Sequence, residues 1–175
     1  MEKHDVLSVI LSRRSVRAFY PEIIPQIHID QFIEALRWAP SAGNRQPWHF
    51  YLIQQSALKR DLARAAFQQD FIAQAPLMFV VCGLPERSAR RYGERGENLY
   101  VFQDTAAAVQ NLLLLATSLG YGTCWVGAFD ESQVSEVLSL PVQERPLALI
   151  PIGKSAEQPS PPQRLPIEKI LTILE

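Results

Sequence analysis

Three arginines and a serine lie close together as Arg13, Arg14, Ser15 and Arg17, between an apolar segment, residues 6–11, and an extended one. A guanidinium group offers a planar fork of N–H donors that matches the oxygens of a phosphate, and a serine hydroxyl adds a further donor. The cluster therefore predicts an anion site. The alternative is a solvated charge run at the end of the preceding helix, since basic residues in a last turn interact favourably with the helix dipole.

A second polar segment, residues 40–47, is rich in turn-forming residues. It follows a helix predicted over residues 29–38, which Pro40 ends, and it precedes an aromatic and β-branched segment, residues 48–53, that is typical of a strand. A polar loop next to a rigid strand is a common place for binding residues.

Other residue types that could do chemistry have simpler explanations. Gly120 and Gly122 follow a helix and precede a strand, the reverse of the order in a dinucleotide-binding motif. Cys124 lies in an apolar segment without a nearby histidine and is predicted to be a buried structural thiol, while Asp104 and Asp130 are predicted to cap helices. No general acid or base is evident, which points to a bound cofactor as the carrier of the chemistry.

Length and composition fit one domain over residues 1–175. The chain is 47% hydrophobic and 20% charged, and its net charge of −1 indicates no general affinity for nucleic acid or acidic membranes. The apolar stretch over residues 106–116 is short for a membrane span, and the charged segment 1–5 does not resemble a signal peptide, so we expect a cytoplasmic protein. Cys82 and Cys124 follow no metal or redox spacing, and His4, His28 and His49 are scattered, so we expect reduced thiols and no metal site.

The remaining elements are assigned from apolar periodicity and turn residues. We predict helices over residues 56–67, 104–119 and 130–138, with a capping box of Asp130 and Gln133 in the last, and a short turn over 68–73. Strands are predicted over residues 77–82, 121–127 and 146–152, the first buried on both faces. Residues 85–96 are polar and basic and are predicted to form a mobile loop at one end of the sheet.

The helix predicted over residues 104–119 is apolar around most of its circumference. In a domain of this size, burial on every side often needs a second subunit, so the pattern favours a homodimer with this helix near the interface. A proline-rich tail, residues 159–166, leads to a short amphipathic segment, residues 167–174. The tail is expected to cross a partner subunit, or alternatively its own core.

Taken together, residues 13–19, 39–48, 104–114 and 119–127 resemble the FMN-dependent nitroreductase family, and the resemblance covers nearly the whole chain. It implies an α+β fold of three layers, in which helices flank a mostly antiparallel central sheet. It also implies an intertwined homodimer with FMN sites at the subunit interface. The chain resembles a compact, short-chain member, because only a brief charged segment lies between Cys82 and Asp104.

The resemblance places contacts with FMN on residues from several segments. Those expected to bind the phosphate and ring are Arg13, Arg14, Ser15 and Arg17, and those expected to reach the flavin from the other subunit are Pro40, Ser41, Ala42 and Asn44. An amide near the ring is expected from Gln68 or Gln69, backbone near flavin N5 from Val126 and Gly127, and further phosphate contacts from Gly153, Lys154 and Arg164. No catalytic side chain is expected, because the flavin carries the chemistry.

The implied function is an NAD(P)H-dependent FMN oxidoreductase that reduces nitroaromatics, quinones or related small electron acceptors by ping-pong hydride transfer. The alternatives are the benzimidazole synthase or dehalogenase chemistry of the same family, a flavin-binding redox sensor with little turnover, and a hydrolase that uses Cys124. No motif separates NADH from NADPH. The candidates for contact with a 2′-phosphate are Arg87, Arg90, Arg91 and Arg95.

Overall fold

The computed structural model describes residues 5–174, so the expectations for segment 1–4, including His4, lie outside the described residues. The centre of the fold is an antiparallel sheet in the order β1 (Phe19–Tyr20), β5 (Arg145–Ser155), β3 (Leu77–Gly83) and β2 (Trp48–Ile53). A short strand, β4 (Gly122–Thr123), also pairs with β5. The α+β class with a mostly antiparallel sheet is therefore confirmed.

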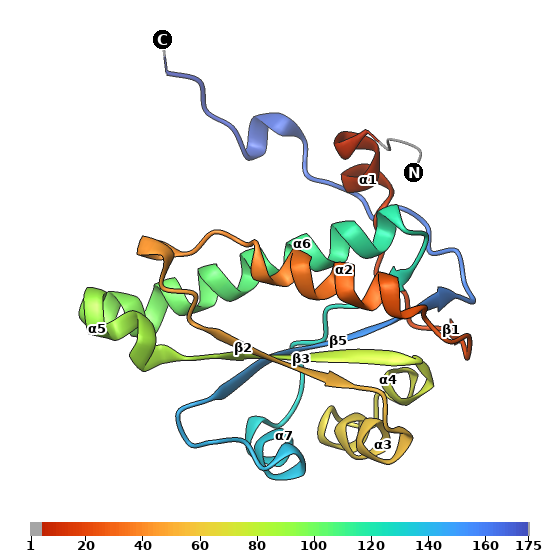
Figure 1. Ribbon diagram of the computed structural model, residues 1–175. Coiled ribbons are helices and arrows are strands. Elements are labelled where there is room, and N and C mark those ends of the chain that lie inside the picture. Colours follow the sequence, from red (N-terminus) through yellow and green to blue (C-terminus); the bar gives the residue numbers. More distant parts are fainter. Residues whose placement is uncertain (1–4, 175) are drawn as a thin grey trace.

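The central strand β3 is buried along its whole length, as its uninterrupted apolar sequence predicts. It pairs with β2 through Phe50 opposite Val81 and with β5 through Phe79 opposite Ile150. Figure 1 shows the reason for this burial, because helices cover both faces of the sheet. One face carries α2 (Gln26–Arg37) and α6 (Val101–Ser118), and the other carries α3 (Ser56–Ala65), α4 (Phe71–Gln74) and α7 (Glu131–Leu138).

Several helix ends follow their sequence signals. Asp130 caps α7, and its side chain accepts a hydrogen bond of 3.0 Å from the Gln133 N–H, as predicted. Gly120 has a φ of 76° directly after the last turn of α6, a conformation that costs glycine little. The helix α2 begins at Gln26, three residues earlier than predicted, because Pro25 takes the N-cap position and its carbonyl accepts hydrogen bonds from the N–H groups of His28 and Ile29. The helix α3 ends at Ala65, since Phe67 and Gln68 adopt positive φ.

The prediction of a mobile loop over residues 85–96 is wrong. This segment forms α5 (Pro85–Arg95), followed by a π-helical turn, η2 (Gly96–Tyr100), that leads into α6. Proline in the first turn and Glu86 at the N-terminus both favour a helix here. Gly93, with a φ of 55°, lets the chain fold back so that Gly96 packs on the backbone of Ser88.

Three other predictions need correction. Asp104 does not cap a helix, because α6 already begins at Val101 and the Asp104 side chain is buried within its first turn. The strand predicted over residues 121–127 is reduced to β4 and a single bridge between Val126 and Leu149. The strand predicted over residues 146–152 is longer, since β5 extends to Ser155 to pair with β1 and β4.

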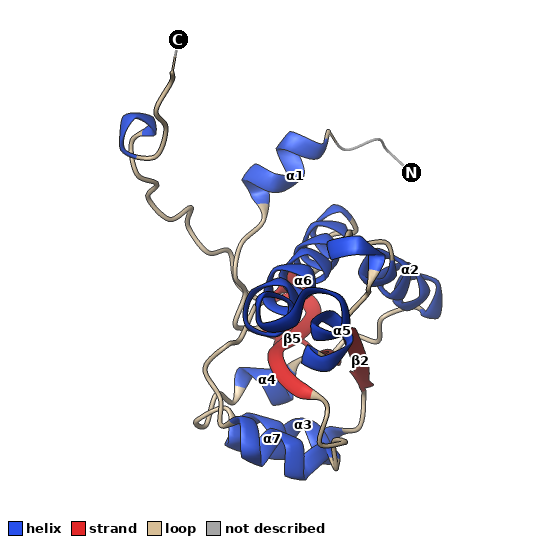
Figure 2. Cartoon of the chain, turned by 90° about the vertical axis from the view of Figure 1, so that its left-hand side faces the viewer, coloured by secondary structure: helices blue, strands red, loops and turns tan. Residues whose placement is uncertain are grey.

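The two ends of the described chain leave the layered body together. Helix α1 (Val6–Ser12) and the C-terminal tail, with its short helix η3 (Ile167–Lys169), both extend beyond the α2 and α6 layer in two perpendicular views (Figures 1 and 2). The tail residues from 160 to 174 are exposed, so the alternative of a strap across the chain's own core is wrong. Within residues 5–174, no helix combines the length and apolarity needed to cross a membrane.

Candidate functional site

The arginine cluster lies in the connection between α1 and β1, where the backbone is fixed at two points. Ser15 forms a parallel bridge with Thr123, and the Val16 N–H donates to the Thr123 carbonyl at 2.8 Å. The Val16 side chain is buried against Gly122, where a Cβ atom would come within 2.8 Å of it. Burial of Val16 and Phe19 therefore holds Arg17, which lies between them, at the edge of the sheet.

The three arginines do not share one environment. The Arg14 guanidinium donates to the carbonyls of Leu11, at 2.7 Å, and Arg13, at 2.8 Å, so it closes the end of α1. These contacts fit the helix-end alternative for Arg14, and its contact with FMN stays a prediction. Among residues 5–174, neither Arg13 nor Arg17 has a carboxylate within ion-pair distance. Their positive charges remain available to an anion.

Lys154 joins this region from the end of β5. Its Nζ donates to the Gly120 carbonyl at 3.3 Å and lies 4.6 Å from the centroid of the Tyr121 ring. The pairing of β5 with β1 sets Lys154 opposite Tyr20, three residues beyond the cluster. At Gly153 a Cβ atom would come within 2.7 Å of the Pro76 ring, so this glycine permits tight packing, and its contact with the phosphate stays a prediction.

The backbone around Val126 and Gly127 is held by hydrogen bonds at the residue before Gly127 and at the residue after it. Val126 is buried and exchanges two backbone hydrogen bonds of 3.0 Å with Leu149. A Cβ atom at Gly127 would have no atom within 4 Å, so space is open for the approach of a ligand. The side chain of Gln69 donates to the Ala128 carbonyl at 2.9 Å, whereas Gln68 is exposed. Of the two amides, Gln69 is therefore the one beside Gly127.

Other predicted site residues are not brought to the cluster within one chain. Pro40, Ser41, Ala42 and Asn44 lie at the opposite end of α2 and α6 from the connection to β1 (Figure 1). Arg164 lies on the exposed tail. A single chain therefore presents two separate groups of predicted residues.

The loop over residues 41–46 is held by Asp104, which the sequence reasoning treated only as a cap. Asp104 Oδ1 accepts a hydrogen bond of 3.1 Å from the Ala42 N–H, while Oδ2 is buried with no partner among the described residues. Burial raises the pKa of this carboxyl, and the Ala42 N–H opposes that shift. The Gln46 N–H donates to Ser41 Oγ at 2.9 Å. No feature of the sequence distinguishes an aspartate that anchors a loop from one that caps a helix.

Cys124 is buried, and burial raises the pKa of its thiol, although the nearby charges of Arg17 and Arg13 act in the opposite direction. The prediction of a structural thiol is confirmed, and the thiolate needed by a hydrolase is disfavoured. The charges of Arg13 and Arg17, the open space at Gly127 and the buried Thr123 Oγ1, which has no hydrogen-bond partner among residues 5–174, instead fit an anionic ligand.

Comparison with known proteins agrees with this geometry. The profile of the Nitroreductase family matches residues 10–69 and 64–154. A Methanothermobacter thermautotrophicus protein provisionally named NADH dehydrogenase/NAD(P)H nitroreductase is 31% identical over 97% of this chain and 90% of its own length. An FMN reductase (NADPH) of Bacillus subtilis is 26% identical over 95% of this chain and 72% of its own.

Among solved structures, the NADPH:FMN oxidoreductase of Vibrio harveyi, in complex with NAD+, superimposes with a TM-score of 0.89 and 25% identity. The match covers 98% of this chain and 78% of that one. The fold is thus the three-layer nitroreductase fold, which this FMN oxidoreductase shares. The chain belongs to the nitroreductase family.

Proposed function

We propose that this protein is an FMN-dependent oxidoreductase that uses NADH or NADPH to reduce small acceptors such as nitroaromatics or quinones. The observation that carries the proposal is the arginine cluster, in which Arg13 and Arg17 have no carboxylate partner in the described chain. The names of the Bacillus and Vibrio relatives support the choice of cofactor and reductant.

The residues of this chain would bind and orient the cofactor. When bound, FMN would supply the redox chemistry, taking a hydride from NAD(P)H and passing two electrons on to the acceptor. Arg13, Ser15 and Lys154 would hold the phosphate, and Arg17 would place positive charge near the flavin ring. Gly127 would let the backbone approach the ring closely, with Gln69 fixing its position through the Ala128 carbonyl.

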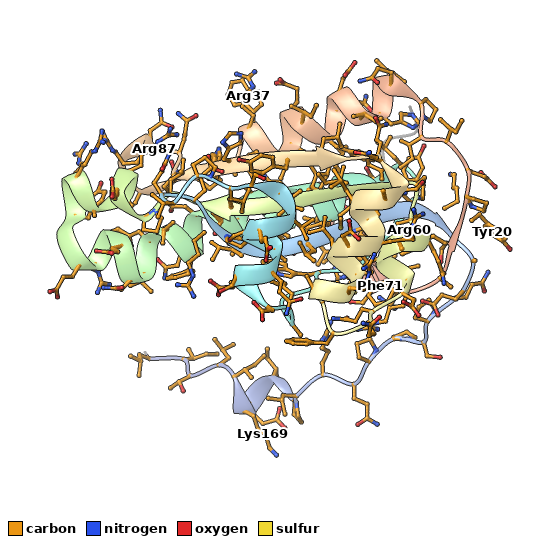
Figure 3. All side chains as sticks on the ribbon, turned by 90° about the horizontal axis from the view of Figure 1, so that it is seen from below. Tyr20, Arg37, Arg60, Phe71, Arg87 and Lys169 are labelled. Carbon is orange, nitrogen blue, oxygen red and sulfur yellow. The ribbon has the colours of Figure 1, made fainter. Side chains whose placement is uncertain are left out.

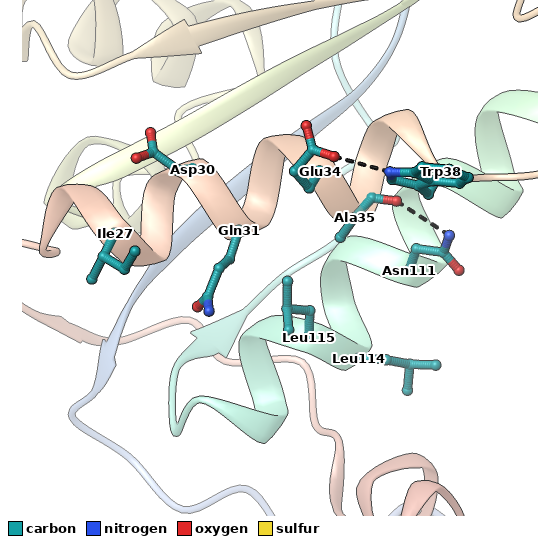
Figure 4. A pocket seen from close by; sticks show the side chains of 9 residues that line it. All are labelled: Ile27, Asp30, Gln31, Glu34, Ala35, Trp38, Asn111, Leu114 and Leu115. Carbon is teal, nitrogen blue, oxygen red and sulfur yellow. Dashed lines mark hydrogen bonds between the residues drawn. The ribbon is translucent and has the colours of Figure 1, made fainter. Parts of the chain in front are cut away.

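The proposed active form is a homodimer, because one chain leaves the loop over residues 41–44 far from its own arginine cluster. An apolar groove of about 540 Å³ runs between α2 and α6, and Figure 4 shows Leu114, Leu115 and Trp38 among the side chains that line it. Exposed apolar side chains on α1 and on the tail, such as Leu11 and Leu174, offer matching surface. Burial of all these surfaces in a second copy would complete two sites.

We propose that reductant and acceptor occupy the same space in turn. This follows from the absence of a Rossmann motif in the sequence, since the nicotinamide would then have to meet the flavin directly. Steady-state rates measured over a grid of NAD(P)H and acceptor concentrations test the scheme. Parallel double-reciprocal lines are expected, and intersecting lines would contradict the shared site.

A further inference from the structure

A second polar pocket, remote from the arginine cluster, lies at the other end of the sheet. It has a volume of about 260 Å³, and its walls come from the start of β2, the first turns of α5 and the loop before β5. The chemically active side chains in its lining are His49, Arg87, Arg90, Glu86 and Glu144. None of them is among the residues proposed to contact FMN, although Arg87 also holds the 41–46 loop through the Gln46 carbonyl.

A buried carboxylate fixes the histidine of this pocket. Glu144 is only 9% exposed, and its two oxygens bind His49 Nδ1 and the Tyr51 hydroxyl, each at 2.8 Å. The His49 ring also stacks on the Tyr51 ring, with centroids 4.7 Å apart. The imidazole is therefore held in one orientation, with Nε2 as its remaining polar atom. The half-exposed side chain can present that atom to a ligand.

The basic residues of α5 fall into two groups. Arg87 and Arg90 line the pocket, and Arg87 Nη1 is anchored on the Gln46 carbonyl at 3.0 Å (Figure 3). Arg91 and Arg95 instead lie over the rings of Tyr92 and Tyr100, at 5.5 and 5.3 Å from their centroids. In the described part of the chain, no carboxylate pairs with Arg87 or Arg90.

We propose that this pocket binds a phosphate group, either free inorganic phosphate or the phosphate of a monoester. Two guanidinium forks suit phosphate oxygens, and an imidazole Nε2 donates to an oxyanion when protonated or accepts from a P–OH group when neutral. The opposing charges are Glu144, already engaged by His49 and Tyr51, and Glu86, which is exposed to solvent. The volume exceeds that of a phosphate alone, so the attached part of a monoester has room.

The proposal is tested by measuring the binding of inorganic phosphate to the purified protein. Equilibrium dialysis with radiolabelled phosphate gives the affinity. The key variant is Arg87→Gln/Arg90→Gln, and the matched control is Arg91→Gln/Arg95→Gln, which removes the same charge from the same helix. We expect saturable binding that weakens by about tenfold or more in the first variant, a change of about 1.4 kcal/mol, and that stays within about twofold of wild type in the control. His49→Gln should also weaken binding.

No saturable phosphate binding by the wild type, or equal weakening in the two double variants, would overturn the proposal. The measurement needs no flavin reduction, so its outcome is independent of the proposed oxidoreductase activity. Thermal unfolding of each variant shows whether the fold is retained, and His49→Gln gives a second test if the double variant fails to fold.

Two sources of the phosphate can be separated by further measurements. If the pocket receives the 2′-phosphate of NADPH, which rests on the proposed function, 2′-AMP should displace phosphate better than 5′-AMP. Arg90→Gln alone, which leaves the Arg87 contact with the 41–46 loop in place, should then raise the KM for NADPH while leaving the KM for NADH unchanged. If 2′-AMP has no advantage and both KM values are unchanged, while phosphate binding is lost, the source is free phosphate or another monoester.

Discussion

At the scale of single residues, the environment of Arg17 explains how one side chain could influence a bound flavin. Its backbone N–H donates to the Glu157 carboxylate, and its neighbour Val16 is buried and bound to Thr123. The backbone is therefore fixed while the guanidinium is exposed and has no ion-pair partner among residues 5–174. A positive charge that is carried on an anchored backbone and has no competing ion-pair partner can stabilise negative charge that develops close to it.

Arg17→Ala should lower the two-electron reduction potential of bound FMN, because the negative charge of the reduced flavin loses a stabilising partner. A contribution of about 1.4 kcal/mol corresponds to a shift of about 30 mV. The potential can be measured by equilibration with a reference dye. The control is Arg64→Ala, which removes an exposed arginine that pairs with Asp61 on α3. An unchanged potential in an Arg17→Ala protein that still binds FMN would contradict this role.

At the scale of elements, the loop over residues 41–46 depends on its attachment to α6 and α5. Gly43, Asn44 and Gln46 all have positive φ, and the last two are not glycines, so the loop holds a strained backbone. Asp104 on α6 binds one end of the loop and Arg87 on α5 binds the carbonyl at the other. These contacts fix the shape of the loop that we expect to reach the partner's flavin.

Substitutions at Asp104 should separate the contribution of its hydrogen bond to stability from the contribution of its charge. Asp104→Ala leaves the Ala42 N–H without its partner and should lower the free energy of unfolding by about 1–3 kcal/mol. Asp104→Asn keeps an acceptor and removes a buried charge, so its stability at neutral pH should equal or exceed that of wild type. Equal destabilisation by both substitutions would show that the charge itself is required.

The difference in stability between wild type and Asp104→Asn should also depend on pH. Because burial raises the pKa of Asp104, the folded state holds this proton more tightly than the unfolded chain does. Its contribution to stability is therefore fully present below the ordinary pKa of an aspartate and is lost as the pH rises through the higher pKa of the folded state. Urea unfolding over a pH series should show wild type losing stability relative to Asp104→Asn across that window. A constant difference between the two proteins would contradict the raised pKa.

The elements show which features a sequence can predict. The strands β2 and β3 were predictable because aromatic, β-branched and continuously apolar runs suit a buried sheet. Helix α5 was missed because it packs on the 41–46 loop mainly through Arg87 and Tyr92, so it lacks the apolar stripe on which helix prediction depends. The separation of the 41–44 loop from the arginine cluster was implied only by the family resemblance, since apolar periodicity and turn residues do not give the direction of α2 across the sheet.

At the scale of the whole molecule, the proposed dimer accounts for apolar surface that one chain leaves exposed. Val6, Leu7 and Leu11 on α1 are each more than half exposed, as are Ile170 and Ile173 in the tail. Exposed apolar area of this extent on two projecting segments is typical of a surface that is buried in an assembly.

Leu114→Glu should convert the dimer to a monomer, because it places a charge in the groove between α2 and α6. Loss of FMN should accompany the change, since the 41–44 loop of a partner would no longer complete the site. Light scattering measures the mass, and Val142→Glu, at a fully exposed position, is the control. Removal of residues 160–175 should also weaken the dimer. A wild-type monomer at micromolar concentration, or a Leu114→Glu dimer that keeps FMN, would contradict the assembly.

The most direct test of the proposed function is an absorption spectrum of the purified protein, followed by anaerobic addition of NADH or NADPH. We expect flavin absorption bands that bleach rapidly with at least one of the two nucleotides, which would establish the cofactor and the reductive half-reaction together. A colourless protein that takes up no added FMN would contradict the account of the Arg13 to Arg17 cluster. A yellow protein that resists reduction by both nucleotides would contradict the proposed enzyme and favour a flavin-binding sensor.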